Sequence, residues 1–269
     1  MKKTIALILT TISTIILITS CSKSNNKEIN DLKFIKISDN NNWNHASNSN
    51  NPYDSIGYLH NVALKNTLEL YQINELNVSN VYNSGIEFSK ERFGINSTDT
   101  LTQNYTIATL GEINNFINEN INFAEIIQET NIKENLKAPI TELIIDILDT
   151  TYLYSSNYDS LKEKIIKWEN NVISFNNFNN EDKLVLLSTS SILRYSLYSW
   201  WTASIPNNNQ GYIKIGWIKK AIGILATAAS DAVAGSVGAS MGGLVGAIIV
   251  GASGSALAAA ILYEKGYFN

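Results

Sequence analysis

The stretch AVAGSVGASMGGLVGAIIVGASGSALAAAIL, residues 232–262, decides the fold that we predict for this chain. It belongs to a longer apolar segment, residues 221–262, whose 42 residues include one charged side chain, Asp231. A continuous helix over the quoted stretch would be about 46 Å long at about 1.5 Å per residue. That length exceeds the roughly 30 Å hydrocarbon core of a bilayer. We therefore expect a kink, a strong tilt or a hairpin, with the bend either at Gly242 and Gly243 or at residues 251–254. Of these we adopt the helical hairpin.

Small side chains recur every four residues in this segment. One row contains Gly238, Gly242 and Gly246, and a second row contains Gly243, Ala247, Gly251, Ser255 and Ala259. On a helix, such rows form grooves that let another backbone approach closely. The pattern resembles the glycine-zipper segments of bacterial envelope proteins, and the resemblance implies close helix packing but no activity. We assign helix packing to Gly238, Gly242, Gly243, Gly246 and Gly251.

The sequence leaves two locations open for this apolar tail. The hairpin either packs inside a water-soluble body or inserts into a membrane. Trp217, Lys219 and Lys220 precede the apolar segment at 221–262, and they fit an interfacial belt as well as a buried aromatic core. Asp231 follows Ser230 and is expected to cap the long helix at its N-terminus rather than to lie on an ion pathway.

The N-terminus has the pattern of a secretory signal. Two lysines precede an uncharged apolar run, residues 4–18, and Cys21 follows Leu-Ile-Thr-Ser at residues 17–20. This pattern resembles the signal of bacterial lipoproteins. The resemblance implies that Cys21 receives a diacylglycerol, that the chain is cut before it, and that the new amine is acylated. An uncleaved transmembrane anchor is the alternative, but the apolar run is short for that role. Ser22, where many inner-membrane lipoproteins have aspartate, favours the outer membrane if the cell has two membranes.

These features divide the chain into four parts: a signal peptide at 1–20, an Asn/Ser-rich tether at 21–51, a helical body at 52–206 and the apolar tail at 207–269. Apolar periodicity predicts the helices of the body. Their expected ranges are a helix capped by Asn51 with Pro52 as its first residue, then 78–92, 110–129, a helix opened by Pro139, 158–174 and 181–204. No strand-like alternation occurs. The expected fold class is all-α, a helical bundle with a C-terminal Gly/Ala-rich hairpin, preceded by the signal peptide and a disordered tether.

The densest polar motif is NPYDSIGYLHN, residues 51–61. A hydrolase would use His60 as general base and Asp54 to orient it. Six residues apart on one helix, however, they lie on different faces and about 9 Å apart along the axis. We expect instead a structural motif, in which the His60 ring packs under a crossing helix and Asn61 bonds a neighbouring loop. The residues of this motif are Asn51, Asp54, Gly57, His60 and Asn61.

The chain resembles a group of uncharacterised Bacteroidota proteins with a signal sequence, an NPYDxxGxxHN motif, helices and a Gly/Ala-rich C-terminal segment. Three stretches carry the similarity: NPYDSIGYLHN at 51–61, SILRYSLYSWW at 191–201 and ASDAVAGSVGASMGG at 229–243. The similarity would span most of the chain after the signal. Because the group has no established activity, the resemblance implies no catalytic residue.

Composition excludes several classes of protein. A net charge of −4 and a pI of about 5.3 argue against a nucleic-acid binder, which carries a basic surface. One cysteine and two histidines exclude a disulfide framework and leave too few ligands for a Cys/His metal site. The acidic row Glu142, Asp146 and Asp149 has the ligand type that calcium prefers, but a solvated helix face is expected. We therefore expect no metal and no cofactor.

The sequence contains no HExxH or P-loop motif, so we do not expect an enzyme. The expected function is that of a membrane-anchored envelope lipoprotein with a structural or interaction role. Its expected partner is membrane lipid, reached through the acylated Cys21, and membrane contact or self-association through the tail is left open. The alternative is a membrane-perturbing or pore-forming, bacteriocin-like protein that acts through residues 232–262. A hydrolase based on His60 is the least favoured hypothesis.

Overall fold

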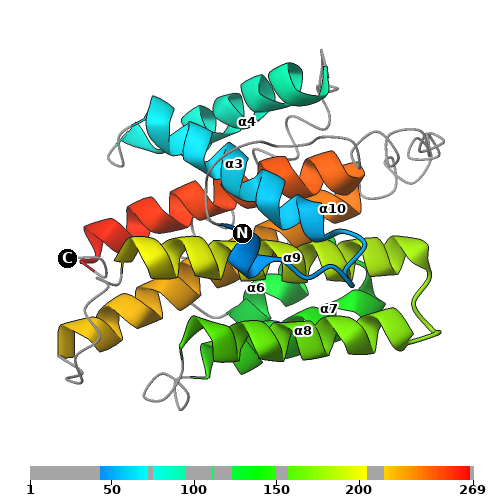
Figure 1. Cartoon of the computed structure of the whole chain (residues 1–269). Helices are drawn as coiled ribbons and strands as arrows, with labels where there is room; N and C mark the ends of the chain where they lie inside the picture. Colours follow the sequence, from blue (N-terminus) through cyan, green and yellow to red (C-terminus); the bar gives the residue numbers. More distant parts are fainter. Residues whose placement is uncertain are drawn as a thin grey trace, which may run out of the picture. The chain divides into compact units, whose positions relative to one another are not determined.

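The computed structural model describes residues 43–71, 75–94, 111, 123–149, 157–204 and 215–266. These residues form seven α-helices and one short 3-10 helix, with no strand among them, which confirms the predicted all-α class (Figure 1). The elements, labelled as in Figure 1, are η1 (Trp43–Ala46), α3 (Asp54–Leu70), α4 (Val78–Phe93), α6 (Phe123–Glu129), α7 (Glu134–Leu148), α8 (Tyr158–Ser174), α9 (Asn180–Ser204) and α10 (Ile215–Glu264).

Several predicted features lie outside the described residues. They include the signal peptide at 1–20, the lipidation site Cys21 and the tether up to residue 42. The side chains of Trp217, Lys219 and Lys220 lie outside them too, as does most of the predicted helix at 110–129. Residues 43–51, which the sequence assigns to the tether, are described, and they pack on the body through the buried side chains of Ala46, Asn48 and Asn51.

Helix α10 is the predicted hairpin. Its backbone leaves helical geometry at Gly242 (φ −125°, ψ 16°) and Gly243 (φ 59°, ψ −139°), so it consists of two arms, residues 215–241 and 244–264. The conformation of Gly243 is essentially restricted to glycine, because a Cβ would collide with the backbone. The turn therefore lies at the first of the two predicted places, and residues 251–254 are helical.

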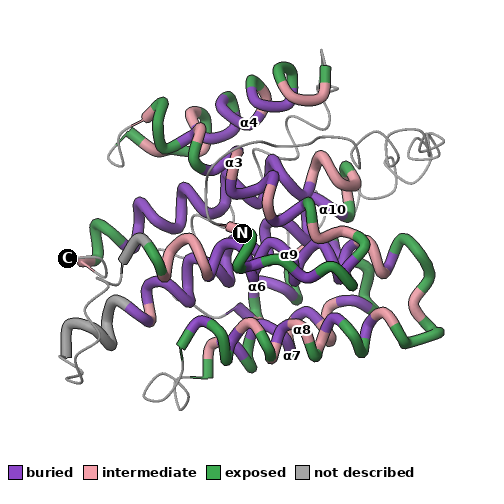
Figure 2. Tube along the Cα trace, in the orientation of Figure 1, coloured by how far each residue is buried: buried purple, intermediate pink, exposed green. Residues whose placement is uncertain are grey.

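The hairpin and α9 form the centre of the described body. Helix α10 packs chiefly on α9, α3 and α4, and α8 and α7 lie on other sides of α9. The apolar hairpin residues are buried almost without interruption over 221–239 and 247–262. Figure 2 shows this burial as continuous purple along the hairpin and along the middle of α9. Apolar burial of this kind is the main stabilising contribution to such a bundle.

Asparagine begins two of the helices. The Asn77 side chain accepts a hydrogen bond from the Asn80 N–H at the start of α4 (3.0 Å), and Asn157 accepts one from the Ser160 N–H at the start of α8 (3.0 Å). Such caps satisfy backbone donors that have no partner within the helix. They explain why the predicted starts of these two helices agree with the structure.

Two predicted helix starts are wrong. Helix α3 begins at Asp54, because Asn51 and Pro52 form a preceding turn in which the Asn51 side chain accepts from the Tyr53 N–H (2.8 Å). Helix α7 begins at Glu134, five residues before Pro139, which lies inside it. The start moves upstream because Leu136 is fully buried. Pro139 has no N–H and cannot donate the helical hydrogen bond to the carbonyl of Asn135. This loss is tolerated because Asn135 is exposed to water.

Candidate functional site

The motif at residues 51–61 is a docking surface between α3 and α9. The backbone N–H of Gly57 donates to Ser191 Oγ (3.1 Å), and the space beside Gly57 is filled by Ser191 and Tyr195. A Cβ at residue 57 would overlap the Ser191 carbonyl oxygen. Asn61 Nδ2 donates to the Tyr195 carbonyl (2.9 Å) and to Ser199 Oγ (2.7 Å). Asn61 thus bonds a helix, and the prediction that it bonds a loop is wrong.

A guanidinium lies fully buried at this interface. Arg194 Nη2 donates to Asp54 Oδ1 (2.5 Å) and to Glu169 Oε1 (3.0 Å), and its Nη1 donates to the Ala46 carbonyl. Both Arg194 and Glu169 are 0% exposed. Burial disfavours the guanidinium charge, but the two carboxylates outweigh it and raise the pKa of Arg194. Burial also raises the pKa of Asp54, against the opposing effect of Arg194.

Glu169 receives further hydrogen bonds that complete this group. Asn48 Nδ2 donates to its Oε2 (2.6 Å), and its Oε1 accepts from Asn51 Nδ2 (2.8 Å) and Ser190 Oγ (2.9 Å). A buried carboxylate is tolerated only with such partners. We call Arg194, Glu169, Asp54, Asn48 and Asn51 the Arg194 cluster. It joins η1, α3, α8 and α9, and its role is to fix these elements to one another.

A second buried polar group surrounds Asp231. Its Oδ2 accepts from Ser196 Oγ of α9 and from Ser255 Oγ of the second hairpin arm (2.8 Å). Trp200 Nε1 donates to Ser255 Oγ (3.4 Å). His60 Nε2 of α3 lies 4.0 Å from the same Oδ2, and both His60 and Asp231 are 0% exposed. The prediction that Asp231 caps a helix is wrong, because α10 begins upstream and Asp231 lies in the middle of its first arm.

The hydrogen bonds assign the tautomer of His60. Asn61 Nδ2 donates to Tyr195 and Ser199, so its Oδ1 is the acceptor for His60 Nδ1 (3.0 Å). His60 Nδ1 therefore carries the hydrogen, and Nε2, which lies 4.0 Å from Asp231 Oδ2, has a free lone pair. Within the described part of the chain, neither His60 Nε2 nor Asp231 Oδ1 has a hydrogen-bond partner of good geometry.

Burial sets the protonation of this pair. Burial raises the pKa of Asp231 to about 8, although hydrogen bonds from Ser196, Ser255 and Trp200 oppose the shift. Burial lowers the pKa of His60 to about 4, against contacts with the Asn61 side chain and the Gly251 backbone. Charging either group alone in this apolar interior is unfavourable. At neutral pH the pair therefore holds one proton and no net charge.

The glycines of the hairpin have different roles. A Cβ at Gly238 would overlap the Gly246 carbonyl, and a Cβ at Gly246 would overlap the Gly238 carbonyl, so these two residues let the arms touch. At Gly251 a Cβ would lie 3.0 Å from the His60 ring. The assignment of helix packing to Gly242 and Gly243 is wrong, because both lie in the turn and a Cβ there would meet nothing within 4 Å.

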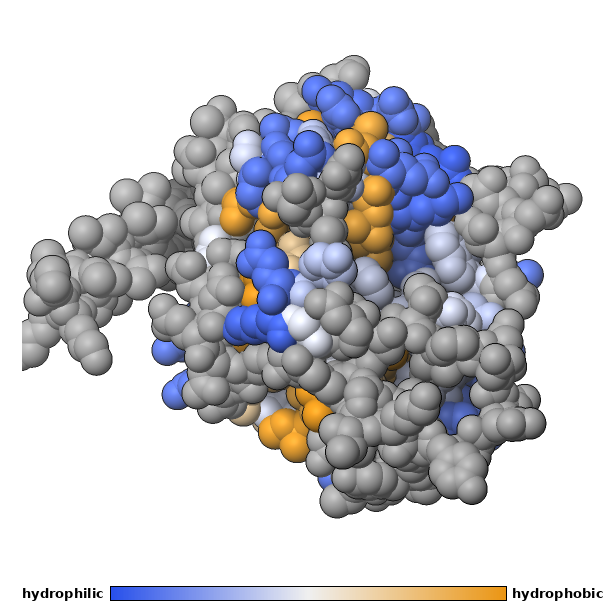
Figure 3. Space-filling model, turned by 90° about the vertical axis from the view of Figure 1, so that its left-hand side faces the viewer, coloured by the Kyte–Doolittle hydropathy of each residue, from blue (hydrophilic) through white to orange (hydrophobic). Residues whose placement is uncertain are grey.

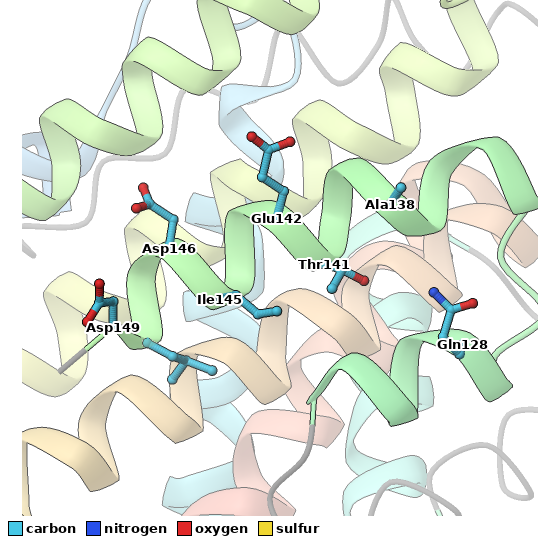
Figure 4. A pocket seen from close by; sticks show the side chains of 8 residues that line it. Gln128, Ala138, Thr141, Glu142, Ile145, Asp146 and Asp149 are labelled. Carbon is cyan, nitrogen blue, oxygen red and sulfur yellow. The ribbon is translucent and has the colours of Figure 1, made fainter.

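The acidic row lines an open depression of about 910 Å³ on α7. Figure 4 shows the carboxylates of Glu142 and Asp146 on the same side of that helix. Asp146 accepts a hydrogen bond from Lys164 Nζ of α8 (3.0 Å), which neutralises part of the row. Among the described residues no three His, Cys, Asp or Glu side chains are grouped closely enough to hold a metal ion.

The hydrolase hypothesis based on His60 and Asp54 lacks the geometry that it requires. Asp54 is engaged by Arg194 and by the Tyr195 hydroxyl (3.1 Å), so it does not orient His60. His60 itself is fully buried, out of reach of a substrate.

No protein-family model, curated protein or solved structure matches the chain.

Sequence reasoning missed the partners of the motif, chiefly Arg194 and Glu169, and the partners of Asp231, which are Ser196 and Ser255. One signal was available for Arg194. It is one of only two arginines in the sequence, and it stands in the otherwise uncharged stretch SILRYSLYSWW. A single arginine in such a stretch indicates a buried cation that needs a carboxylate. Nothing in the sequence distinguishes Glu169 from the other acidic residues of α8.

Proposed function

We propose that this protein is an envelope lipoprotein, attached to a membrane through acylated Cys21, with a structural or interaction role on the outer membrane. The observation that carries the proposal is the sequence Leu-Ile-Thr-Ser-Cys at residues 17–21 behind a charged and then apolar N-terminus. Two or three acyl chains anchor a protein stably, whereas one does not.

The packing of the tail supports an anchor of this kind. Within the described residues one helix, Ala221–Glu264, is long and apolar enough to cross a membrane, and most of it is buried in the body. The large hydrophobic side chains that remain exposed are scattered: Leu68, Leu70, Ile145, Phe175 and Tyr263. On the face drawn in Figure 3, the described hydrophobic side chains form separate groups among hydrophilic ones. A body with this surface needs a separate anchor, such as a covalently attached lipid, to remain bound to a membrane.

Metabolic labelling with palmitate tests the anchor. The full chain is expected to incorporate the label and to fractionate with outer membranes, whereas Cys21→Ala is expected to lose both. Ser22→Ala is the matched control and should retain the label. Label that persists in Cys21→Ala would overturn the proposal.

A second candidate function is membrane perturbation through residues 232–262. The specific observation in its favour is the position of the turn. From Ala221 to the turn, and from the turn to Glu264, each arm has 21 residues, which corresponds to about 32 Å of helix. That length matches a roughly 30 Å hydrocarbon core. Release of a trapped dye from liposomes tests this function, and wild-type protein that releases no dye under any condition removes it.

A further inference from the structure

The described body is held together by two kinds of contact, one polar and one apolar. The Arg194 cluster joins η1, α3, α8 and α9 through charge-assisted hydrogen bonds at 2.5–3.2 Å. The hairpin contacts α9, α3 and α4 largely through Ala, Ile, Val and Leu. Apolar surface is stable against protein and equally stable against lipid tails. The hairpin is therefore the part of the fold that a bilayer can accept in place of the body.

Apart from the hydrogen bond of Ser253 Oγ to the Val81 carbonyl of α4 (3.2 Å), the described side-chain hydrogen bonds that tie the hairpin to other helices converge on Asp231 and its partner Ser255. Asp231 is the only charged side chain in residues 221–262. Its Oδ2 atom is bonded to Ser196 of α9 and Ser255 of the other arm, and it faces His60 of α3. One carboxyl group thus connects the first arm to the second arm and to the two helices that cover it.

We propose that Asp231 and His60 form a proton-dependent latch, which keeps the hairpin inside the body while the pair holds one proton and releases it toward a lipid bilayer when that proton is lost. The release step rests on the membrane function proposed above. The latch itself concerns the body in water and is tested separately.

The physical reason is the charge of the pair. With one proton, the pair is neutral whether the proton lies on Asp231 or on His60. When that proton is lost, Asp231 becomes a carboxylate among apolar helices. A buried charge without a counter-charge is strongly destabilising. The nearest buried cation, Arg194, is already bonded to Asp54 and Glu169 and does not neutralise it.

Among the described residues, no other titratable side chain contributes to the pKa shifts of this pair. The groups that face Asp231 are Ser196 and Trp200 from α9, Ser255 from the second arm and His60 from α3. Asn61 of α3 and the Gly251 backbone face His60. No charged side chain of the described residues of α4, α6 or α7 shifts the pKa of either group. The pH response of the latch therefore belongs to these two residues.

Thiol labelling in water tests the latch. Cys21 is the only cysteine, so the full chain with Cys21→Ser accepts a single reporter. Ile249→Cys reports on the hairpin, because Ile249 is 6% exposed, and Phe175→Cys at the end of α8, 48% exposed, corrects for the reactivity of the thiol itself. The ratio of the two labelling rates is expected to rise about tenfold or more between about pH 6.5 and about pH 8.5.

Two variants of the pair separate a latch from general loosening. Asp231→Asn should abolish the rise in this range, because the amide does not titrate. In His60→Gln the labelling ratio should still rise with pH, but the rise should begin at a lower pH, because the released state then binds no proton on residue 60. The proposal is overturned if the labelling ratio still rises in Asp231→Asn, or if it does not rise in the parent chain. If Asp231→Asn does not fold, the shift in His60→Gln decides alone.

A disulfide tests the release step. A Cβ on Gly85 of α4 would lie 3.6 Å from the Ile249 Cβ, within the roughly 3.5–4.5 Å of natural disulfides. Gly85→Cys with Ile249→Cys, in the Cys21→Ser chain, therefore fixes the second arm to α4 when oxidised. With vesicles of phosphatidylethanolamine and phosphatidylglycerol at about pH 8.5, the oxidised form should release at least about tenfold less dye than the reduced form.

The outcomes of the two assays are distinct. If the labelling ratio depends on pH but no form of the protein releases dye, the latch is supported and the membrane function is contradicted. If the protein releases dye to the same extent at every pH, the membrane function is supported and the latch is contradicted. Equal release by the oxidised and reduced forms shows that the hairpin is not the inserting element, and it overturns the release step.

Discussion

His60 Nε2 lies 4.0 Å from Asp231 Oδ2, with both side chains fully buried and on different helices. The two groups depart from their ordinary pKa values in opposite directions, Asp231 upward to about 8 and His60 downward to about 4. Each shift expresses the same physical fact, that the interior between α3, α9 and the hairpin does not tolerate a single charge. The pH dependence of stability is the direct consequence.

The pair predicts a plateau followed by a loss of stability at alkaline pH. Between about pH 4 and about pH 6.5 the folded pair holds one proton on Asp231, and the unfolded chain holds one on His60, so stability does not change. Between about pH 6.5 and about pH 8 only the folded pair holds the proton, and the free energy of unfolding should fall by about 2 kcal/mol. Urea denaturation at a series of pH values measures this.

The two single variants have opposite pH slopes. In Asp231→Asn the lowered pKa of His60 acts alone, so stability should rise from about pH 4 to about pH 6.5 and then stay level. In His60→Gln the raised pKa of Asp231 acts alone, so stability should fall from about pH 4 to about pH 8. Parallel curves for the parent and both variants would contradict the assigned pKa shifts.

The Arg194 cluster predicts a large effect from one substitution. Arg194→Ala leaves Glu169 as a buried carboxylate without a cation, and it should lower the free energy of unfolding by about 3–5 kcal/mol. Arg194→Lys should recover only part of this loss, because an ammonium cannot reproduce the forked contacts with Asp54 and Glu169. Chemical denaturation at neutral pH gives these values.

A matched control and a double variant sharpen this test. Arg92→Ala in α4 removes the other arginine, and it should cost less than about 1 kcal/mol because no described residue forms an ion pair with Arg92, which is only partly buried. Arg194→Met combined with Glu169→Gln should be more stable than Arg194→Ala, because the fully buried carboxylate of Glu169 is then replaced by a neutral amide. Similar losses for both arginines would show that the cluster does not act as described.

The caps predict which asparagines stabilise the fold. Asparagine is abundant, at 36 residues, and only some of these have a structural role. Asn157→Ala removes the cap of α8 and should cost about 1 kcal/mol. Asn170→Ala in the exposed interior of the same helix should be neutral or slightly stabilising, because alanine is the better helix former. Thermal unfolding compares the two, and a larger loss for Asn170→Ala would contradict the assignment.

The sequence predicts those parts of the fold that depend on local patterns. The range 158–174 for α8 follows from periodicity, and helix length predicts a bend in the tail at one of two places, of which the structure has the first, Gly242 and Gly243. The range of α9, predicted at 181–204 and observed at Asn180–Ser204, also follows from local pattern, but its packing partners do not, because its middle is buried on nearly all sides and has no single apolar stripe. Its serines and Arg194 appear polar in the sequence, whereas in the fold they bond the motif of α3.

The sequence predicts only one of the two sets of residues that form the candidate site, the motif on and before α3. The sequence identifies Asn51, Asp54, Gly57 and His60 as a motif, but their partners lie on α8, α9 and α10, far along the chain. Which helix crosses α3, and at which register, is decided by the packing of the whole bundle. The same reason explains the error at Asp231. A local pattern indicates a cap, and only the packed hairpin places that carboxyl group opposite His60.

The hairpin turn predicts different effects for three glycines that the sequence treats as equivalent. Gly246→Ala places a methyl group on the Gly238 carbonyl and should cost about 1–3 kcal/mol, because the arms must separate. Gly243→Ala meets open space but must adopt a φ of 59°, and that strain should also cost about 1–3 kcal/mol. Gly242→Ala has open space and a negative φ of −125°, so it should change stability by less than about 0.5 kcal/mol. Equal losses in chemical denaturation for Gly242→Ala and Gly246→Ala would mean that both glycines lie in one continuous helix contact, and the turn would then be misplaced.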